Sequence, residues 1–334
     1  CLLHEKPFAG VNGSGKHNNW SITTDDGINL LDPGTTPHEN VQFLLVLACI
    51  LKAVDTHADL LRESAADVGN DHRLGANEAP PAIISVFLGE QLQDVVEQLI
   101  STGSATHSKE GGKLQTGVKT LPDLAKDATD RNRTSPFAFT GNKFEFRMLG
   151  SAASVANPNI VLNTAVAEAL DQFAKELDGV APEDMEHAVH ELIKRAIKKH
   201  KRVIFNGNGY SEAWEAEAAR RGLPNRKCTP DAMVALKEEK NISLMEEFGV
   251  LTKVEMESRY EVEMEHYSKI INIEALTMLE MARKQLLPAV NAYMSEVANT
   301  AASKLAVSEN LSVRSETKAL TRLSADADAM SDAV

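Results

Sequence analysis

The chain has 334 residues, which allows one large domain or two of ordinary size, with a substantial hydrophobic core in either case. Its formal net charge of −13 excludes a general electrostatic attraction to nucleic acid or to anionic membranes. The sequence also lacks an apolar run of the roughly 18 residues that a membrane-spanning helix needs. Three cysteines without a Cys-x-x-Cys pair argue against a disulfide scaffold and fit a reducing cytoplasm. The composition therefore predicts a globular cytoplasmic protein without nucleic-acid or membrane partners.

The first part of the chain mixes short strands, turns and one clear helix. The chain opens with Cys-Leu-Leu-His and its apolar pattern starts at once, so we expect a piece of a longer protein. Residues 6–11 are predicted to form a strand that ends in a glycine-rich turn. A polar loop with two glycines and two prolines is expected over residues 67–81. Residues 144–147 alternate between phenylalanine and a charged residue, as a half-buried strand does.

The clear helix is predicted over residues 36–61. Thr36 can cap it, Pro37 suits its first position, and Glu39 can reach back to complete a capping box. Apolar residues then recur at helical spacing as far as Leu61.

From about residue 160 the pattern is almost entirely helical. Apolar stripes predict helices over residues 160–177 and 185–197, and further helices are expected to begin at Thr229, Ser243 and Thr252. Pro288 is expected to kink the last long helix, since proline cannot donate a helical hydrogen bond. Successive helices with apolar stripes favour a bundle. Residues 308–334 are rich in Ser, Ala and Asp and are predicted to be disordered.

The first segment that could carry chemistry is residues 12–17, Asn-Gly-Ser-Gly-Lys-His. Residues 10–16 match the start of a phosphate-binding loop, but His17 stands where that loop needs a hydroxyl for magnesium. This argues against a nucleotide P-loop. Two interpretations stay open: a tight turn with a surface histidine, or a rigid turn that presents His17 as a metal ligand or base.

Three further segments carry charged residues in patterns that suit anionic substrates. In residues 70–81, Arg73 could clamp a carboxylate and Glu78 could act as a general base, although a solvated surface loop is the plainer interpretation. Arg131 and Arg133 are close enough to suit phosphate binding. In residues 143–147, alternation places a carboxylate between two cations on one strand face. Such a face suits a metal-bound anion, or it is simply open to water.

Taken together and in this order, these segments resemble glutamine synthetases. The shared motifs are Asn-Gly-Ser-Gly-x-His, an arginine followed by Glu-Ala-Pro, then Arg-Asn-Arg, x-x-Glu-x-Arg and Ala-Asn-Pro. The stretches HEKPFAGVNGSGKHNNWS and NDHRLGANEAPPAIISVFLG are similar to the large type III class in particular. The resemblance implies an α+β fold. Residues 1–160 would be the carboxy-terminal part of a catalytic domain with a largely antiparallel sheet, residues 161–307 a helical carboxy-terminal region, and residues 308–334 the disordered tail.

The resemblance also implies an enzyme that joins ammonia to the γ-carboxylate of glutamate with ATP, through γ-glutamyl phosphate and with Mg²⁺ or Mn²⁺. By motif, His17 and Glu145 would hold the metal ion that orients the γ-phosphate. Arg73 and Arg147 would bind the glutamate carboxylate and the transferring phosphate. Glu78 would be the flap carboxylate that closes the site and assists deprotonation of ammonium.

The remaining residues implied by the resemblance bind the two substrates. Asn12 and Gly13 would contact glutamate, whereas Ser21, Arg133 and Lys143 would lie at the nucleotide. In the commoner bacterial class, histidine or arginine stands at three positions that this chain fills with Asn19, Ala138 and Lys143. These departures suggest a different nucleotide pocket.

The family takes further metal-binding glutamates, and an amino-terminal β-grasp domain, from residues that precede the glycine-rich turn. We therefore expect this chain to hold part of an active site, in a ring-shaped homo-oligomer whose subunits share sites, and to be inactive in isolation. Two alternatives stay open. The chain could belong to a non-catalytic assembly or regulatory member of the same fold, or to a ligase that joins glutamate to another amine.

Overall fold

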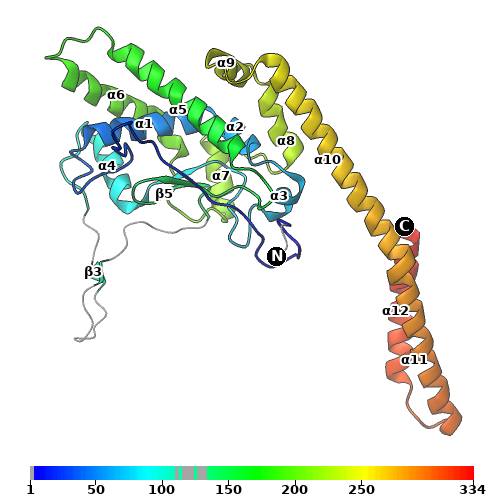
Figure 1. Ribbon diagram of the computed structural model, residues 1–334. Coiled ribbons are helices and arrows are strands. Elements are labelled where there is room, and N and C mark those ends of the chain that lie inside the picture. Colours follow the sequence, from blue (N-terminus) through cyan, green and yellow to red (C-terminus); the bar gives the residue numbers. More distant parts are fainter. Residues whose placement is uncertain (1–3, 110–112, 115–123, 126–133) are drawn as a thin grey trace. The chain divides into compact units, whose positions relative to one another are not determined.

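The computed structural model describes residues 4–109, 113–114, 124–125 and 134–334 (Figure 1). The chain forms two compact units, Cys1–Met264 and Glu265–Val334, which are described separately. The secondary structure is mixed α+β, as the sequence predicts, with a small sheet in the first unit and many helices. Among the described residues, no helix combines the length and the apolar character that crossing a membrane requires.

The sheet of the first unit has four short strands in the order β1-β6-β5-β2. Their bounds are β1 (Asn18–Trp20), β6 (Phe144–Phe146), β5 (Phe137–Phe139) and β2 (Val86–Phe87). The β1–β6 and β6–β5 pairs are antiparallel and the β5–β2 pair is parallel. A separate antiparallel pair is formed by β3 (Lys113–Leu114) and β4 (Leu124–Ala125). The predicted strand at residues 144–147 is thus confirmed.

Alternation along β6 separates an apolar face from a polar one. Phe144 and Phe146 are fully buried, and Phe144 stacks on Phe137 with ring centroids 4.6 Å apart. Glu145 lies on the other face, in register with Asn19 of β1 and Ala138 of β5. Two of the three residues that depart from the commoner bacterial pattern, Asn19 and Ala138, therefore flank Glu145 directly.

Helices cover the apolar face of the sheet. The bounds of the helices in the first unit are α1 (Val41–Thr56), α2 (Ala58–Glu63), α3 (Val68–Arg73), α4 (Gly89–Ser101), α5 (Ala156–Leu177), α6 (Met185–His200), η1 (Lys201–Val203), α7 (Glu212–Arg220), α8 (Thr229–Met233), η2 (Val234–Lys237) and α9 (Glu239–Glu247). Phe43 of α1 meets Phe139 of β5, and α5 and α6 both pack on α1 (Figure 1). One core therefore runs across residue 160, where the sequence pattern changes.

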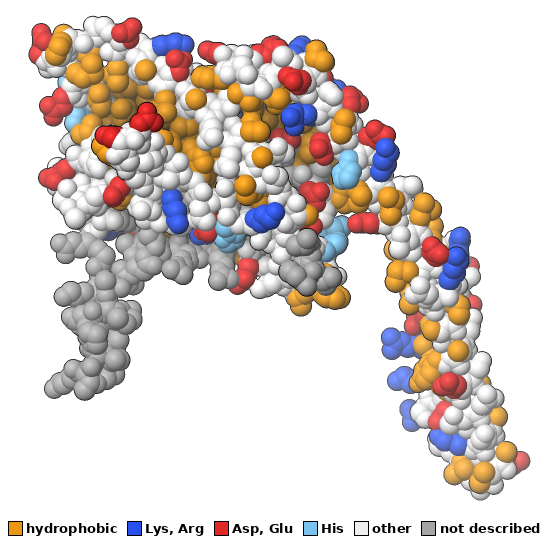
Figure 2. Space-filling model, in the orientation of Figure 1, with side chains coloured by type: hydrophobic (Ala, Val, Ile, Leu, Met, Phe, Trp, Pro, Cys, Tyr) orange, Lys and Arg blue, Asp and Glu red, His pale blue; other side chains and the backbone are white. Residues whose placement is uncertain are grey.

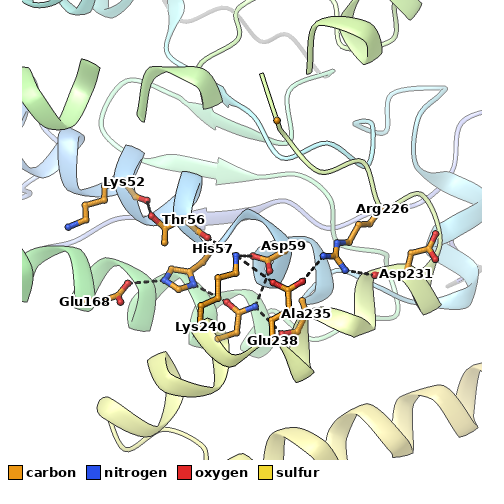
Figure 3. A network of polar contacts seen from close by, with 12 residues as sticks. Lys52, Thr56, His57, Asp59, Glu168, Arg226, Asp231, Ala235, Glu238 and Lys240 are labelled. Carbon is orange, nitrogen blue, oxygen red and sulfur yellow. Dashed lines mark hydrogen bonds and ion pairs between the residues drawn. The ribbon is translucent and has the colours of Figure 1, made fainter. Parts of the chain in front are cut away.

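A buried polar cluster, here called the His57 network, ties these helices together (Figure 3). The His57 ring bonds Glu168 of α5 through Nε2 (2.8 Å) and Asn241 of α9 through Nδ1 (2.9 Å). The Asn241 amide donates to Asp59 (3.0 Å), and Lys240 donates to the other Asp59 oxygen (2.8 Å). The network therefore links the junction of α1 and α2 to two helices that are distant in sequence.

Several local predictions for the first part of the chain are wrong. Residues 6–11 form turns and bends, not a strand. The helix begins at Val41, because Asn40 and not Thr36 accepts the hydrogen bond from Phe43 N (3.0 Å). It also ends early: His57 leaves helical geometry to join its network, and α2 starts behind it.

Two further predictions, for residues 67–81 and for the helix at Ser243, are also wrong. The first half of the expected polar loop is the helix α3, which Asp67 caps by accepting from Gly69 N (3.0 Å). The helix expected from Ser243 begins at Glu239, because Asn241 and Ile242 pack into the core. In contrast, the predicted helix starts at Thr229 and Thr252 are confirmed, and Thr252 forms a capping box with Glu255.

The last helices are α10 (Lys253–Met281), η3 (Ala282–Leu286), α11 (Leu287–Val307) and α12 (Arg314–Ala333). A π-helical turn, η3, stands where a kink was predicted before Pro288. The tail predicted to be disordered is helical, since α12 presents Leu320, Leu323 and Met330 at helical spacing and packs on α11. Many hydrophobic side chains of these helices stay exposed, as Figure 2 shows.

Candidate functional site

The polar face of β6 brings together three of the predicted site residues. His17 immediately precedes β1, and its Nδ1 lies 2.9 Å from Oε1 of Glu145. The other oxygen of Glu145 accepts from Arg147 Nε at 2.8 Å. Strand alternation explains the arrangement, because residues two apart share a face and Asn19, two after His17, is in register with Glu145. The antiparallel pairing of β1 with β6 thus brings together His17 and Glu145, which are 128 residues apart in sequence.

The electrostatics of this cluster favour an ionised Glu145. Burial by itself would raise the pKa of the carboxyl, but the hydrogen bond and charge of Arg147, followed by those of His17, lower it below its ordinary value. The side chains differ in exposure, at 40 % for His17, 17 % for Glu145 and 4 % for Arg147. The cluster therefore has a buried cation behind a carboxylate and a histidine that faces solvent.

The glycine-rich turn packs tightly against Arg73. Ser14 N donates to Glu5 O (2.7 Å), and Gly15 pairs with Gly150 beyond the end of β6. A Cβ atom at Gly13 would lie 2.3 Å from Glu5 O and 3.1 Å from Arg73 Cγ, and one at Gly15 would lie 2.1 Å from Arg73 Nη2. Glycine is therefore needed at position 13 mainly for the Glu5 backbone and at position 15 for the arginine.

Arg73 itself is buried and braced by the protein. Its guanidinium donates to the Asn70 side chain and to the carbonyl oxygens of Arg147, Met148 and Leu149, at 3.1 to 3.2 Å. This geometry makes Arg73 a support between α3, the glycine turn and the end of β6. Its predicted contact with a substrate carboxylate or phosphate is not tested by this geometry and stays a prediction.

Glu78 lies in the short exposed segment that follows α3. Gly75 N donates to Pro80 O (2.9 Å) and closes this segment into a tight loop. Asn77 and Glu78 both have positive φ angles, 52° and 69°, in the left-handed region that residues other than glycine seldom adopt. The Glu78 side chain is exposed, whereas the neighbouring Ala79 is buried. A strained, exposed carboxylate between rigid anchors is suited to a flap, which remains a prediction.

Among the predicted substrate and nucleotide residues, Asn12, Gly13, Ser21 and Lys143 lie in the described part of the chain. Asn12 is exposed beside Gly13, and the Ser21 hydroxyl donates to Asn29 (2.7 Å). Lys143 lies half-buried in the turn between β5 and β6. Arg133 lies outside the described residues.

Sequence reasoning missed residues that hold the site in place. Glu5 is 5 % exposed and accepts from Ala152 N (2.7 Å), next to the glycine turn. Asn159 and Asn163 of α5 bond the side chains of Asn18 and Trp20 at 2.8 and 2.9 Å, and so fix β1. A lone acid before a glycine turn was a usable signal for Glu5. The two asparagines show no such signal, because their partners lie more than 100 residues away.

The donor set of His17 and Glu145 fits a divalent metal ion. Imidazole nitrogen and carboxylate oxygen suit manganese and, through the oxygen, magnesium. Within the described residues, groups of three or more His, Cys, Asp or Glu side chains that could hold a metal ion are absent.

Comparison with known proteins points to one family. Residues 188–305 match the family model described as the glutamine synthetase C-terminal domain. The chain is 51 % identical over 301 residues to the type-3 glutamine synthetase of Dictyostelium discoideum, and the match covers 90 % of this chain and 41 % of that protein. It is 50 % identical over 310 residues to a glutamine synthetase of Butyrivibrio fibrisolvens, covering 91 % of this chain and 43 % of that protein.

A glutamine synthetase of Bacteroides fragilis (strain YCH46) is 42 % identical over 300 residues, which are 89 % of this chain and 41 % of that protein. The chain thus spans about two fifths of the length of the curated relatives it matches. The resemblance found in the motifs is therefore confirmed: over about nine tenths of its length, this chain is related to the glutamine synthetases, and to the type III class in particular.

Proposed function

We propose that this chain carries part of the active site of a type III glutamine synthetase, which forms glutamine from glutamate, ammonia and ATP. The observation that supports this most directly is the 2.9 Å contact of His17 with Glu145 beside Arg147, in a chain so similar to enzymes of that name. In the proposed reaction the γ-carboxylate of glutamate attacks the γ-phosphorus of ATP and releases ADP. Ammonia then displaces phosphate from γ-glutamyl phosphate, and the proton lost from ammonium passes to a protein carboxylate.

His17 and Glu145 would hold a Mg²⁺ or Mn²⁺ ion, which when bound neutralises charge on the transferring phosphoryl group. The hydrogen bond from Arg147 Nε to Glu145 fixes the orientation of the guanidinium, so its positive charge lies beside the carboxylate before substrate binds. A cation held in place before the reaction stabilises developing negative charge without reorganisation. Arg147, supported from behind by Arg73, would serve the phosphate and the glutamate carboxylate.

Glu78 would accept the proton from ammonium and help to close the site. Its loop is polar and exposed, and bound anionic substrates would add further contacts to it. Closure would also exclude water, which would otherwise hydrolyse γ-glutamyl phosphate. Asn12 and Gly13 would contact glutamate, while Ser21, Lys143 and Arg133 would serve ATP.

The remaining parts of the proposal concern the whole protein. Further metal ligands would come from other residues of the full-length protein, whose relatives are more than twice as long as this chain. The isolated chain would therefore make no glutamine, because an ion held by two ligands cannot align ATP with glutamate. We propose a cytoplasmic, ring-shaped homo-oligomer whose subunits share active sites, without nucleic-acid or membrane partners.

The function is tested by phosphate release from ATP with the full-length protein, glutamate and a varied amine. Ammonia-dependent release with formation of glutamine is expected. Release only with another amine would indicate a different glutamate ligase, and no release with any amine would indicate a non-catalytic member of the fold.

The role of Glu78 is tested in the same assay. Glu78→Ala is expected to lower glutamine formation by roughly 100-fold, as is typical of a lost general base, while the affinity for ATP stays nearly unchanged. Unchanged turnover with altered thermal stability alone would show that Glu78 is a surface residue without a role in the reaction.

A further inference from the structure

Residues 22–30, here called the Asn29 hairpin, fold back on themselves just after β1. Thr23 and Asn29 pair in an antiparallel bridge across the hairpin. Its tip contains Gly27, whose φ angle of 88° lies in the left-handed region that favours glycine. Leu31, the first residue beyond the hairpin, is fully buried in the core. The backbone of Asn29 is therefore held from both sides.

The Asn29 side chain joins three segments through hydrogen bonds of ordinary length. Its Oδ1 accepts from Ser21 Oγ (2.7 Å), just after β1, and from Leu31 N (3.0 Å). Its Nδ2 donates to Asn142 O (2.8 Å), in the turn between β5 and β6. These partners fix the orientation of the amide, because a backbone N–H can bond only its oxygen and a backbone carbonyl only its nitrogen. Asn29 is therefore a link between the end of β1 and the β5–β6 turn.

The turn that Asn29 reaches carries Lys143. Thr140 N donates to Lys143 O (2.8 Å) and closes the turn. The Ser21 hydroxyl also lies 3.4 Å from Asn142 O, but its single proton is used in the shorter bond to Asn29. The bond from the Asn29 amide is therefore the stronger of these two ties to the turn. Lys143 follows Asn142 directly, so the placement of the Asn142 carbonyl sets the backbone from which the Lys143 side chain leaves the turn.

We infer that Asn29 is a positioning residue for the nucleotide site: its amide holds the β5–β6 turn in the place from which Lys143 reaches ATP. The inference rests on the proposed function, in which Lys143 serves ATP. An ammonium group on a long, flexible side chain binds an anion more tightly when its backbone is already fixed, because less conformational entropy is then lost on binding. Loss of the Asn29 amide should therefore weaken the binding of ATP and leave the chemical step unchanged.

The test compares Asn29→Ala with Asn40→Ala in the full-length protein. Asn40 is the matched control, because its side chain also accepts from a backbone N–H, that of Phe43 (3.0 Å), and donates to a backbone carbonyl, that of Asp32 (3.2 Å), but it caps α1. Asn29→Ala should raise the KM for ATP by about fivefold, as expected for one net hydrogen bond, with kcat and the KM for glutamate unchanged.

Two measurements that do not depend on turnover accompany the kinetics. In Asn29→Ala, the Kd of a non-hydrolysable ATP analogue should rise by the same factor of about five. Hydrogen exchange of the Thr140 amide, which is bonded within the turn, should become about fivefold faster. Asn40→Ala should lower the melting temperature through the lost helix cap and leave the KM, the Kd and the Thr140 exchange rate as in the wild type.

A double variant tests whether Asn29 acts through Lys143. Lys143→Ala alone should raise the KM for ATP, and adding Asn29→Ala should raise it further by less than about twofold, because the two changes remove the same interaction. Effects that multiply in the double variant would overturn the inference and leave the proposed function intact. A wild-type KM for ATP in Asn29→Ala, or an equal rise in Asn40→Ala, would do the same. A wild-type protein that makes no glutamine would overturn the proposed function and the positioning role together.

Discussion

Two histidine–glutamate pairs in the first unit have nearly the same contact distance but differ in their exposure to solvent. His17 lies 2.9 Å from Glu145, and His57 lies 2.8 Å from Glu168. The His17 side chain is 40 % exposed, whereas that of His57 is 2 % exposed. Contact between the two residue types therefore does not distinguish a chemical site from a structural one.

The difference lies in how many hydrogen bonds each pair has already made. Both ring nitrogens of His57 have hydrogen-bond partners, Glu168 and Asn241, so neither nitrogen is left for a further ligand. The assignment of Asn241 is fixed, because its amide nitrogen donates to Asp59 and to Ala235 O. The His57 network has its hydrogen bonds made and stabilises one packing of the helices. The pair of His17 and Glu145, in contrast, lies near the surface beside Arg147.

The largest effect that separates the two pairs is expected on catalysis. Glu145→Ala in the full-length protein should lower kcat by about 10²- to 10³-fold, because the carboxylate orients Arg147 and would bind the metal ion. Steady-state glutamine formation measures this, and a loss of thermal stability accompanies it because the buried Arg147 loses its carboxylate partner. Glu168→Ala is the matched control and should lower stability without lowering kcat. Equal losses of activity and stability in both variants would remove the distinction between the pairs.

A smaller effect is expected on stability, where the His57 pair should matter more than the His17 pair. His57→Ala should lower the free energy of unfolding by about 3 kcal/mol, since it leaves buried partners in the network without their donor. His17→Ala should change it by less than about 0.5 kcal/mol, as is usual at exposed positions. Denaturant unfolding of the two variants provides the comparison. A His17 variant that unfolds as readily as the His57 variant would contradict it.

The smallest effect concerns a third carboxylate, Glu63 at the end of α2. Burial and the nearby Glu263 raise its pKa to about 7, against the opposing influence of Arg259 and Arg62. A carboxyl with a raised pKa binds its proton more tightly in the folded state. It therefore contributes stability below about pH 4, the unfolded value, and that contribution is lost as the pH rises through about 7.

Glu63→Gln mimics the protonated form and should therefore stabilise the protein at pH 8 by about 1 kcal/mol, allowing for solvent screening, with no effect at pH 4. Thermal unfolding at the two pH values measures this difference. Glu217→Gln offers a control, because hydrogen bonds from Arg220 and Arg221 lower the pKa of that half-buried carboxylate. A Glu63→Gln variant with the same effect at both pH values would show that the carboxyl does not titrate in this range.

Patterns of short range predicted much of the site and of the fold. Alternation at residues 143–147 placed Glu145 and Arg147 on one strand face, and the structure joins them at 2.8 Å. Helical spacing predicted α5 and α6, and the capping box at Thr252 marked the start of α10. Motif order linked His17 to Glu145 across the chain, and the two side chains do meet. These features could be found because each depends on residues near in sequence or on the order of the motifs along the chain.

The tertiary structure decided what depends on partners far along the chain. Thr36 is a good helix cap by local chemistry, but Asn40 caps α1 in the structure. The helix ends at His57, whose ring is held by Glu168 and Asn241. Arg73 looked like an exposed clamp in a polar loop, yet its guanidinium is buried against carbonyl groups at the end of β6.

The sequence by itself therefore determined which residues could supply the chemistry of this protein, because the periods of strand and helix fix which side chains share a face. Which of them are open to solvent was decided only by the packing of distant segments, as the exposed His17 and the buried His57 show. The physical reason is that burial and saturation of hydrogen bonds depend on the whole surroundings of a group, and local patterns describe only the part contributed by its neighbours in the chain.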